Sequence, residues 1–151
     1  MRVVRPGGAS LSLGTSGVLF VASDRCRANP DRAVHAFCHG LPDTWHQMSV
    51  ILSAASCLSW VTQLTGAKDE GALLAEVEAV DRPSDALVFL PYLSGERTPH
   101  NDARATGSFV GLDHETDRAS MGRAVLEGVA FAFADAQDAL LSAGTAIESV
   151  S

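Results

Sequence analysis

The chain has 151 residues, enough for one compact domain with its own hydrophobic core. Apolar residues make up 46% of the chain and charged residues 19%, which is ordinary for a globular protein and excludes a disordered one. The formal net charge of −7 argues against a nucleic-acid-binding surface, because phosphate backbones require a basic patch and the sequence has no stripe of Arg and Lys.

The cysteines and the apolar stretches bear on cellular location. Cys26, Cys38 and Cys57 are an odd number without framework spacing, which predicts reduced thiols. The first residues do not show the basic, apolar and small-residue order of a secretory leader, so we expect no secretory signal. The most apolar stretch, residues 48–64, carries many Ser and Thr hydroxyls, which favours a buried helix over a membrane span. We therefore expect a cytoplasmic protein with no membrane partner.

The predicted elements begin with a β-hairpin. Short apolar runs at residues 9–13 and 18–23 flank Gly14-Thr15-Ser16-Gly17, and we expect the glycines to take positive φ at this turn. A polar, irregular stretch follows over residues 24–43, with one strand near 34–38.

Two helices are predicted next. Residues 47–64 place apolar side chains on two helical faces, which predicts a helix buried on most sides and ending at Gly66. Residues 69–80 predict an amphipathic helix with leucine and valine inward and glutamate outward. The Pro-containing segment 81–84 breaks that helix.

The second half of the chain begins with a continuous apolar run at residues 86–90, which predicts a central strand. Residues 91–106 form a long loop rich in Gly, Pro and Arg, and long loops inside compact domains often carry function. Residues 108–112 predict another short strand.

A long helix is predicted from a cap at Thr116 or Asp117 to about residue 143. Its middle, residues 124–134, is apolar almost all round, so we expect protein to cover both of its sides. The order of hairpin, helices, strand, loop, strand and helix indicates a layered α/β domain.

Gly14-Thr15-Ser16-Gly17, called the Thr15 turn below, is the strongest local signal. Such a turn directs backbone N–H groups and the hydroxyls of Thr15 and Ser16 into a concavity, and concavities of this kind bind phosphate. The alternative is that these four residues only form the turn of the hairpin, which their types favour without any ligand. The segment is neither a nucleophile elbow, because Val18 replaces the required second glycine, nor a Walker loop, because the lysine is absent.

Two other groups invite a functional interpretation. Residues 35–39 (HAFCH) and His46 suggest a metal site, but they lack a second pair at structural-zinc spacing, which favours ordinary core or surface roles. Glu96 and Arg97, in the long loop, are most simply an ion pair; lining a functional cleft is the alternative.

Three segments, in order along the chain, resemble the FGGY carbohydrate kinase family. Residues 10–20 resemble its second phosphate-binding segment, and residues 107–128 resemble its second signature. Residues 90–100 (LPYLSGERTPH) resemble a stretch of the xylulokinase branch. The resemblance implies an actin/hexokinase/Hsp70-like (ribonuclease H-like) ATPase domain, an α/β layered sheet flanked by helices, with ATP bound in an interdomain cleft.

The resemblance also implies roles for particular residues. Gly14, Thr15 and Ser16 would hold the β- and γ-phosphates of ATP, with Mg²⁺ bridging phosphate oxygens mostly through waters. Ala55 and Ser59 lie in a segment that approaches the nucleotide in related kinases, which often carry Gly and Gln at these positions. No catalytic residue or metal ligand is assigned within the chain. The catalytic aspartate is expected upstream of it.

We therefore expect residues 1–151 to be part of a C-terminal nucleotide-binding domain of the FGGY type, without the N-terminal sugar-binding domain and the adenine-binding C-terminal segment, and inactive alone. An apolar face left on the last helix would favour self-association, and a homodimer is one possible oligomeric state. The expected substrates of the full-length enzyme are ATP and a ketopentose, D-xylulose, giving xylulose 5-phosphate. The alternatives are a sibling kinase of glycerol, gluconate, ribulose or fuculose, or a non-catalytic nucleotide-binding module of the same fold.

Overall fold

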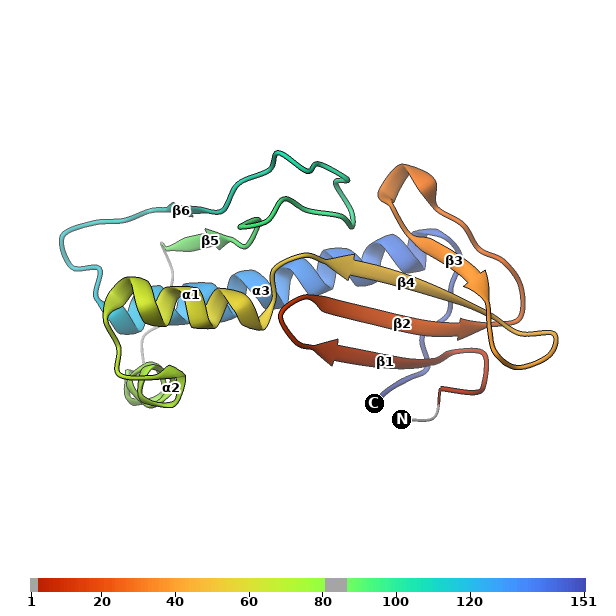
Figure 1. Cartoon of the computed structure of the whole chain (residues 1–151), viewed down its shortest axis with the longest axis horizontal. Coiled ribbons are helices and arrows are strands. Elements are labelled where there is room, and N and C mark those ends of the chain that lie inside the picture. The colour runs from red at the N-terminus through yellow and green to blue at the C-terminus, as the bar shows by residue number, and fades with distance from the viewer. Residues whose placement is uncertain (1–2, 81–86) are drawn as a thin grey trace.

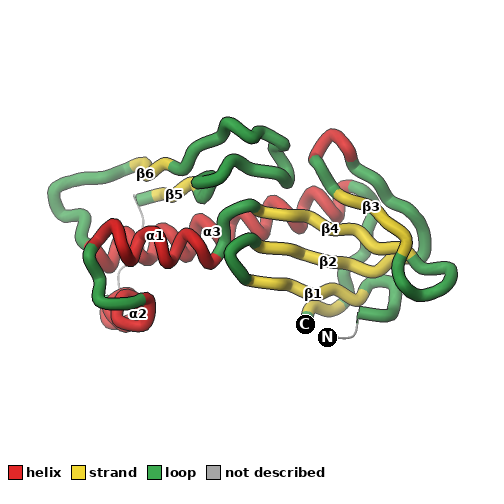
Figure 2. The backbone as a smooth tube through the Cα atoms, viewed as in Figure 1, coloured by secondary structure: helices red, strands yellow, loops and turns green. Residues whose placement is uncertain are grey.

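The computed structural model describes residues 3–80 and 87–151. A five-stranded sheet occupies one end of the molecule, and a single long helix runs behind it and beyond it (Figure 1). The other helices and a two-stranded ribbon gather around the part of the long helix that extends past the sheet (Figure 2). The elements are β1 (Gly8–Leu13), β2 (Gly17–Ser23), a 3₁₀ turn (Pro30–Arg32), β3 (His35–Cys38), β4 (Trp45–Ile51), α1 (Ala55–Thr65), α2 (Glu70–Ala79), β5 (Val88–Leu90), β6 (Ser108–Val110), α3 (Arg118–Ser142) and β7 (Ser149–Val150).

The predicted hairpin is confirmed as β1 and β2. The sheet has the order β3-β4-β2-β1-β7, with β7 parallel to β1 and the other pairs antiparallel. Register Leu13↔Gly17 closes the hairpin directly at the Thr15 turn. The strand predicted near residues 34–38 is confirmed as β3.

The helix predicted over residues 47–64 is wrong in its first part. Residues 45–51 form β4, which pairs with β2 over its whole length, from Ser23↔Trp45 to Gly17↔Ile51. Burial alternates along β4, with Gln47 and Ile51 buried and Met48 between them half-buried. The apolar residues of 47–52 fit helical and strand spacing equally well over so short a run, and pairing with β2 decides between the two.

The helix begins only at Ala55 and ends, as predicted, at Gly66, which adopts the left-handed conformation (φ +67°). α2 is confirmed, with the Asp69 side chain accepting a hydrogen bond from the Ala72 N–H as its N-cap. Its buried residues are Leu73 and Val77. The predicted breaker at 81–84 lies outside the described residues.

α3 is confirmed over Arg118–Ser142, and the Asp117 side chain caps it by accepting from the Ser120 N–H. The expectation that protein covers both sides of its middle is wrong for this chain, because Leu126 and Phe131 are 37% and 66% exposed. No helix in residues 3–80 or 87–151 has the length and apolar character needed to cross a membrane.

The strand predicted at 86–90 exists as β5, but it is not central. Among the described residues it pairs only with β6, in a separate two-stranded ribbon. Its centre, Phe89, is buried. The Phe89 ring stacks on Trp60 of α1 at a centroid distance of 5.7 Å and lies tilted against Phe109 of β6 at 4.7 Å. The apolar run therefore serves packing against α3 and α1, and its outer side chains remain exposed.

Candidate phosphate-binding site

The Thr15 turn is tied to the first residues of α1. The N–H of Ala54 donates to the Thr15 carbonyl, and the N–H of Ala55 donates to the Gly14 carbonyl, both at 2.9 Å. The Ser56 hydroxyl also donates to the Thr15 carbonyl, at 2.8 Å. These bonds engage carbonyl oxygens that would otherwise repel an anion, and they fix the turn beside the helix N-terminus.

The glycines of the turn do not have the role that we predicted. Neither Gly14 nor Gly17 adopts positive φ, so that expectation is wrong. Gly17 is required instead by close packing, because a Cβ there would lie 2.4 Å from Phe133 Cζ and 2.6 Å from Ile51 Cγ1. A Cβ on Gly14 would meet only the Ser16 carbonyl oxygen, at 3.7 Å, so the space above Gly14 is open to a ligand.

A cavity of about 420 Å³ opens beside the turn, within the usual volume of small-molecule sites. We call it the hydroxyl cavity. It brings together three of the five predicted site residues, Thr15, Ala55 and Ser59; Gly14 and Ser16 belong to the same turn. It also lies at the N-terminus of an 11-residue helix, where the helix dipole favours negative charge. Its lining residues are Thr15, Ala55, Ser56, Ser59, Trp60 and Gln63.

The hydroxyl groups of the site differ in their availability. Ser16, expected to point into the concavity, donates instead to the Leu52 carbonyl at 3.1 Å. Ser56 donates to the turn, and Ser59 donates to Glu70 Oε1 at 2.7 Å. The Thr15 hydroxyl has no hydrogen-bond partner among the described residues, and among the hydroxyls of the site it is the one that remains to donate to a ligand.

The charge distribution favours the Thr15 end of the hydroxyl cavity for an anion. The hydrogen bond from Ser59 lowers the pKa of the exposed Glu70 carboxyl, which is therefore ionised at neutral pH. A phosphate near Ser59 would face this carboxylate. A phosphate at Thr15 would face the helix N-terminus instead.

The long loop reaches the same region through Glu96. The expected ion pair with Arg97 is wrong: Glu96 is only 2% exposed, and its Oε1 accepts hydrogen bonds from the backbone N–H groups of Leu52 and Arg97, at 3.1 and 2.6 Å. Burial raises the pKa of the Glu96 carboxyl. The sequence offers no local signal for this placement, because the contact joins residues 44 positions apart.

The histidines of the suggested metal site, in residues 35–39 and at position 46, pack against aromatic rings of the sheet and against each other. His46 stacks on Phe20 at a centroid distance of 4.6 Å, and His39 lies edge-on to His46 at 5.9 Å. The part of the chain that the structure describes holds no group of three or more His, Cys, Asp or Glu side chains arranged for a metal ion. The three cysteines are free thiols, and burial raises the pKa of Cys57 to about 12.

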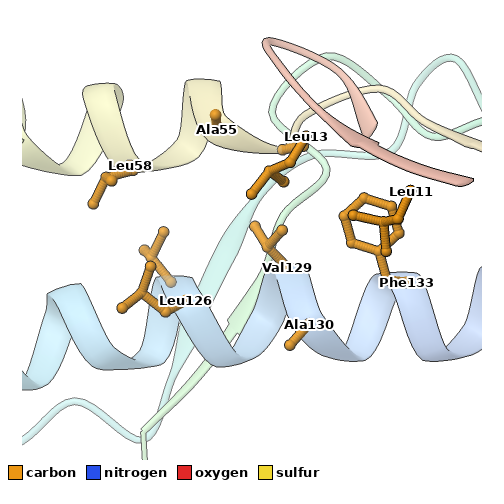
Figure 3. Close-up of a pocket in the computed structure, with 10 residues that line it drawn as sticks. Leu11, Leu13, Ala55, Leu58, Leu126, Val129, Ala130 and Phe133 are labelled. Carbon is orange, nitrogen blue, oxygen red and sulfur yellow. The ribbon is translucent and has the colours of Figure 1, made fainter. Parts of the chain in front are cut away.

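A second depression, called the apolar groove below, lies on the other side of Ala55 (Figure 3). Its volume is about 250 Å³. Leucines from β1 and α1 face Val129 and Phe133 of α3 across it. Its lining residues are Leu11, Leu13, Ala54, Ala55, Leu58, Val125, Leu126, Val129, Ala130 and Phe133.

The mixed sheet with its flanking helices has the actin/hexokinase/Hsp70-like (ribonuclease H-like) ATPase fold, which similar solved kinase structures share. The structure of a xyloylose kinase from Brucella ovis is similar at a TM-score of 0.93 and 56% identity, covering 98% of this chain and 30% of that one. Residues 9–151 match the FGGY family of carbohydrate kinases, C-terminal domain. The chain belongs to this family.

Curated relatives extend the comparison. The xylulose kinase of Escherichia coli (strain K12) is 51% identical over 94% of this chain, and that of Klebsiella pneumoniae is 53% identical over 87%. The chain spans 29% and 27% of the length of these two proteins. The matches confirm the family resemblance of the three sequence segments.

Proposed function

We propose that the chain is part of the nucleotide-binding domain of an ATP-dependent carbohydrate kinase that converts D-xylulose to xylulose 5-phosphate. Relatives at 51% and 53% identity are named xylulose kinases, which supports this substrate. The observation that carries the proposal is the Thr15 hydroxyl, which bonds none of the described residues and lies at a polar cavity beside the α1 N-terminus. The remaining parts of the longer cytoplasmic enzyme would supply the sugar site, the catalytic aspartate and the adenine site.

The site fits the phosphates of ATP. The open space above Gly14 admits a phosphate close to the backbone, and the Thr15 hydroxyl can donate to one of its oxygens. ATP supplies the γ-phosphoryl group that is transferred. Phosphoryl transfer depends mainly on positioning and on stabilisation of negative charge, and the α1 N-terminus and Thr15 supply both here. We assign Mg²⁺ no ligand from the described residues, and it enters only as the companion of the phosphates.

Substitution of Thr15 in the full-length enzyme tests the proposal. We expect Thr15→Ala to lower kcat by roughly 10- to 100-fold, the loss of one hydrogen bond to a charged group, and to change the KM for the sugar much less. Steady-state kinetics with D-xylulose and ATP measures both. Thr44→Ala is the matched control, because the Thr44 hydroxyl donates to the nearby Pro42 carbonyl in the loop between β3 and β4, away from the Thr15 turn.

An unchanged kcat in Thr15→Ala would remove the Thr15 turn from catalysis. The substrate is tested separately, with a panel of D-xylulose, glycerol, gluconate, ribulose and fuculose on the full-length enzyme. The largest kcat/KM is expected for D-xylulose, and a larger value for any other sugar would contradict the substrate assignment.

A further inference from the structure

Glu96 is a buried carboxyl whose interactions lead toward the Thr15 turn and away from solvent. Only 2% of the residue is exposed, although it lies in a long loop whose neighbours Ser94 and Arg97 are exposed. Oε1 receives two backbone N–H bonds, whereas Oε2 is buried and has no partner among the described residues. Burying a carboxyl costs free energy unless its hydrogen bonds compensate for the lost hydration.

The loop around Glu96 is held firmly against the end of β4. The Thr98 N–H donates to the Val50 carbonyl, and the Val50 N–H donates to Thr98 Oγ1, both at 3.0 Å. Glu96 itself exchanges two backbone hydrogen bonds of 2.9 Å with Asp102 across the loop. Gly95 permits this path, because its φ is +75° and a Cβ would lie 2.9 Å from Ala103 Cα. The carboxyl is therefore placed by rigid surroundings.

Leu52 connects this carboxyl with the Thr15 turn. Its N–H donates to Glu96 Oε1 at 3.1 Å, and its carbonyl accepts from the Ser16 hydroxyl at 3.1 Å. Two residues later, the N–H groups of Ala54 and Ala55 hold the carbonyls of Thr15 and Gly14. The segment from Leu52 to Ala55 is thus bonded to Glu96 on one side and to the turn on the other.

We infer that Glu96 is a positioning residue that holds the Leu52–Ala55 segment, and through it the Thr15 turn, at the distance required for the phosphates of ATP. The inference rests on the function proposed above for that turn. The Glu96 side-chain oxygen is a fixed acceptor for the Leu52 N–H, and it holds this N–H in one place as exchanging solvent would not. Glu96 touches no reacting atom in this scheme.

The test compares Glu96→Ala and Glu96→Gln in the full-length kinase. Glu96→Ala leaves the Leu52 N–H without its partner, and we expect the KM for ATP to rise and kcat to fall, each by roughly 3- to 10-fold. The KM for D-xylulose should stay within about twofold, since the sugar site is not held by this contact. Glu96→Gln retains an acceptor oxygen and should restore most of the ATP KM and kcat.

Two controls separate positioning from general loss of stability. Glu78→Ala removes an exposed glutamate of α2 and should change neither constant. Leu140→Ala opens a cavity in the separate core cluster beneath the sheet, and destabilises the fold without touching the turn. If Leu140→Ala raised the ATP KM as much as Glu96→Ala, or if both substrates' KM values rose together in Glu96→Ala, the positioning role would be overturned.

Thr15→Ala distinguishes failure of this inference from failure of the proposed function. An effect of Thr15→Ala without one of Glu96→Ala overturns the role of Glu96 and leaves the phosphate site standing. No effect of Thr15→Ala overturns the phosphate site, and with it the role of Glu96. Loss of ATP binding in Glu96→Ala that Glu96→Gln does not restore at all would also contradict the inference, because the acceptor oxygen is present in that variant.

Discussion

The hydroxyl cavity and the apolar groove share Ala55 of α1 but differ in the polarity of the side chains that line them. The hydroxyl cavity combines polar side chains with a helix N-terminus, whereas leucine, valine, alanine and phenylalanine line the groove (Figure 3). A charged phosphate gains hydrogen bonds in the first and would lose its hydration without compensation in the second. The short helix α1 therefore borders a polar cavity on one side and an apolar packing surface on the other.

Gly17 lies at the end of the Thr15 turn and packs against Phe133 of the apolar groove, so a larger side chain there would disturb both regions. Gly17→Val would push Phe133, which lines the groove, and Ile51, which ends β4, away from the start of β2. We expect a loss of about 3 kcal/mol or more in the free energy of unfolding, because the clash lies in a packed core. Urea unfolding measures this loss. Gly40→Val is the control, since a Cβ at Gly40 meets no atom within 4 Å. Equal stability of the two variants would contradict the packing role of Gly17.

The apolar groove is expected to drive self-association of the 151-residue chain. Leu13 is 59% exposed at its rim, and Leu13→Lys should weaken association by about 10-fold while costing little stability. Sedimentation velocity over a range of concentrations measures the shift. Leu64→Lys serves as the matched control, because Leu64 is 56% exposed on α1 outside the groove. A monomeric wild-type chain at high concentration would exclude this role for the groove.

The smallest effect is expected at Ser59, at the far end of the hydroxyl cavity. Its hydroxyl is already engaged by Glu70, so Ser59→Ala in the full-length enzyme should change the KM for ATP by about threefold or less. Isothermal titration with ATP gives the same comparison at equilibrium. If Ser59→Ala changed kcat or the KM for ATP as much as Thr15→Ala does, the phosphates would lie near Ser59. That result would contradict the expectation that the Glu70 carboxylate keeps an anion away from Ser59.

Local chemistry accounts for much of what could be predicted. The hairpin around the Thr15 turn, the end of the helix at Gly66 and the cap at Asp117 all depend on residues within a few positions of one another. The confirmed extent of α3 follows from the same kind of short-range signal. These features could be predicted because the contacts that stabilise them join residues close together in the sequence.

The predicted site residues are a mixed case. The family resemblance named Thr15, Ala55 and Ser59, and the structure brings these three to one cavity. The sequence could not predict which of these hydroxyls can donate to a ligand. Ser16 and Ser59 donate to Leu52 and Glu70, and these partners are brought close only in the folded chain. Their assignment to ATP remains a prediction until the kinetics are measured.

The sequence by itself determined the family, the local turns and caps, and the residues that approach the candidate phosphate site. Only the tertiary structure decided that residues 45–51 form a strand, that β5 lies outside the main sheet, and that Glu96 is buried against Leu52. The physical reason is the distance along the chain. These outcomes depend on partners between 18 (Leu90 and Ser108) and 44 (Leu52 and Glu96) positions away, and no local propensity encodes which partner a short apolar run or a loop carboxyl will meet.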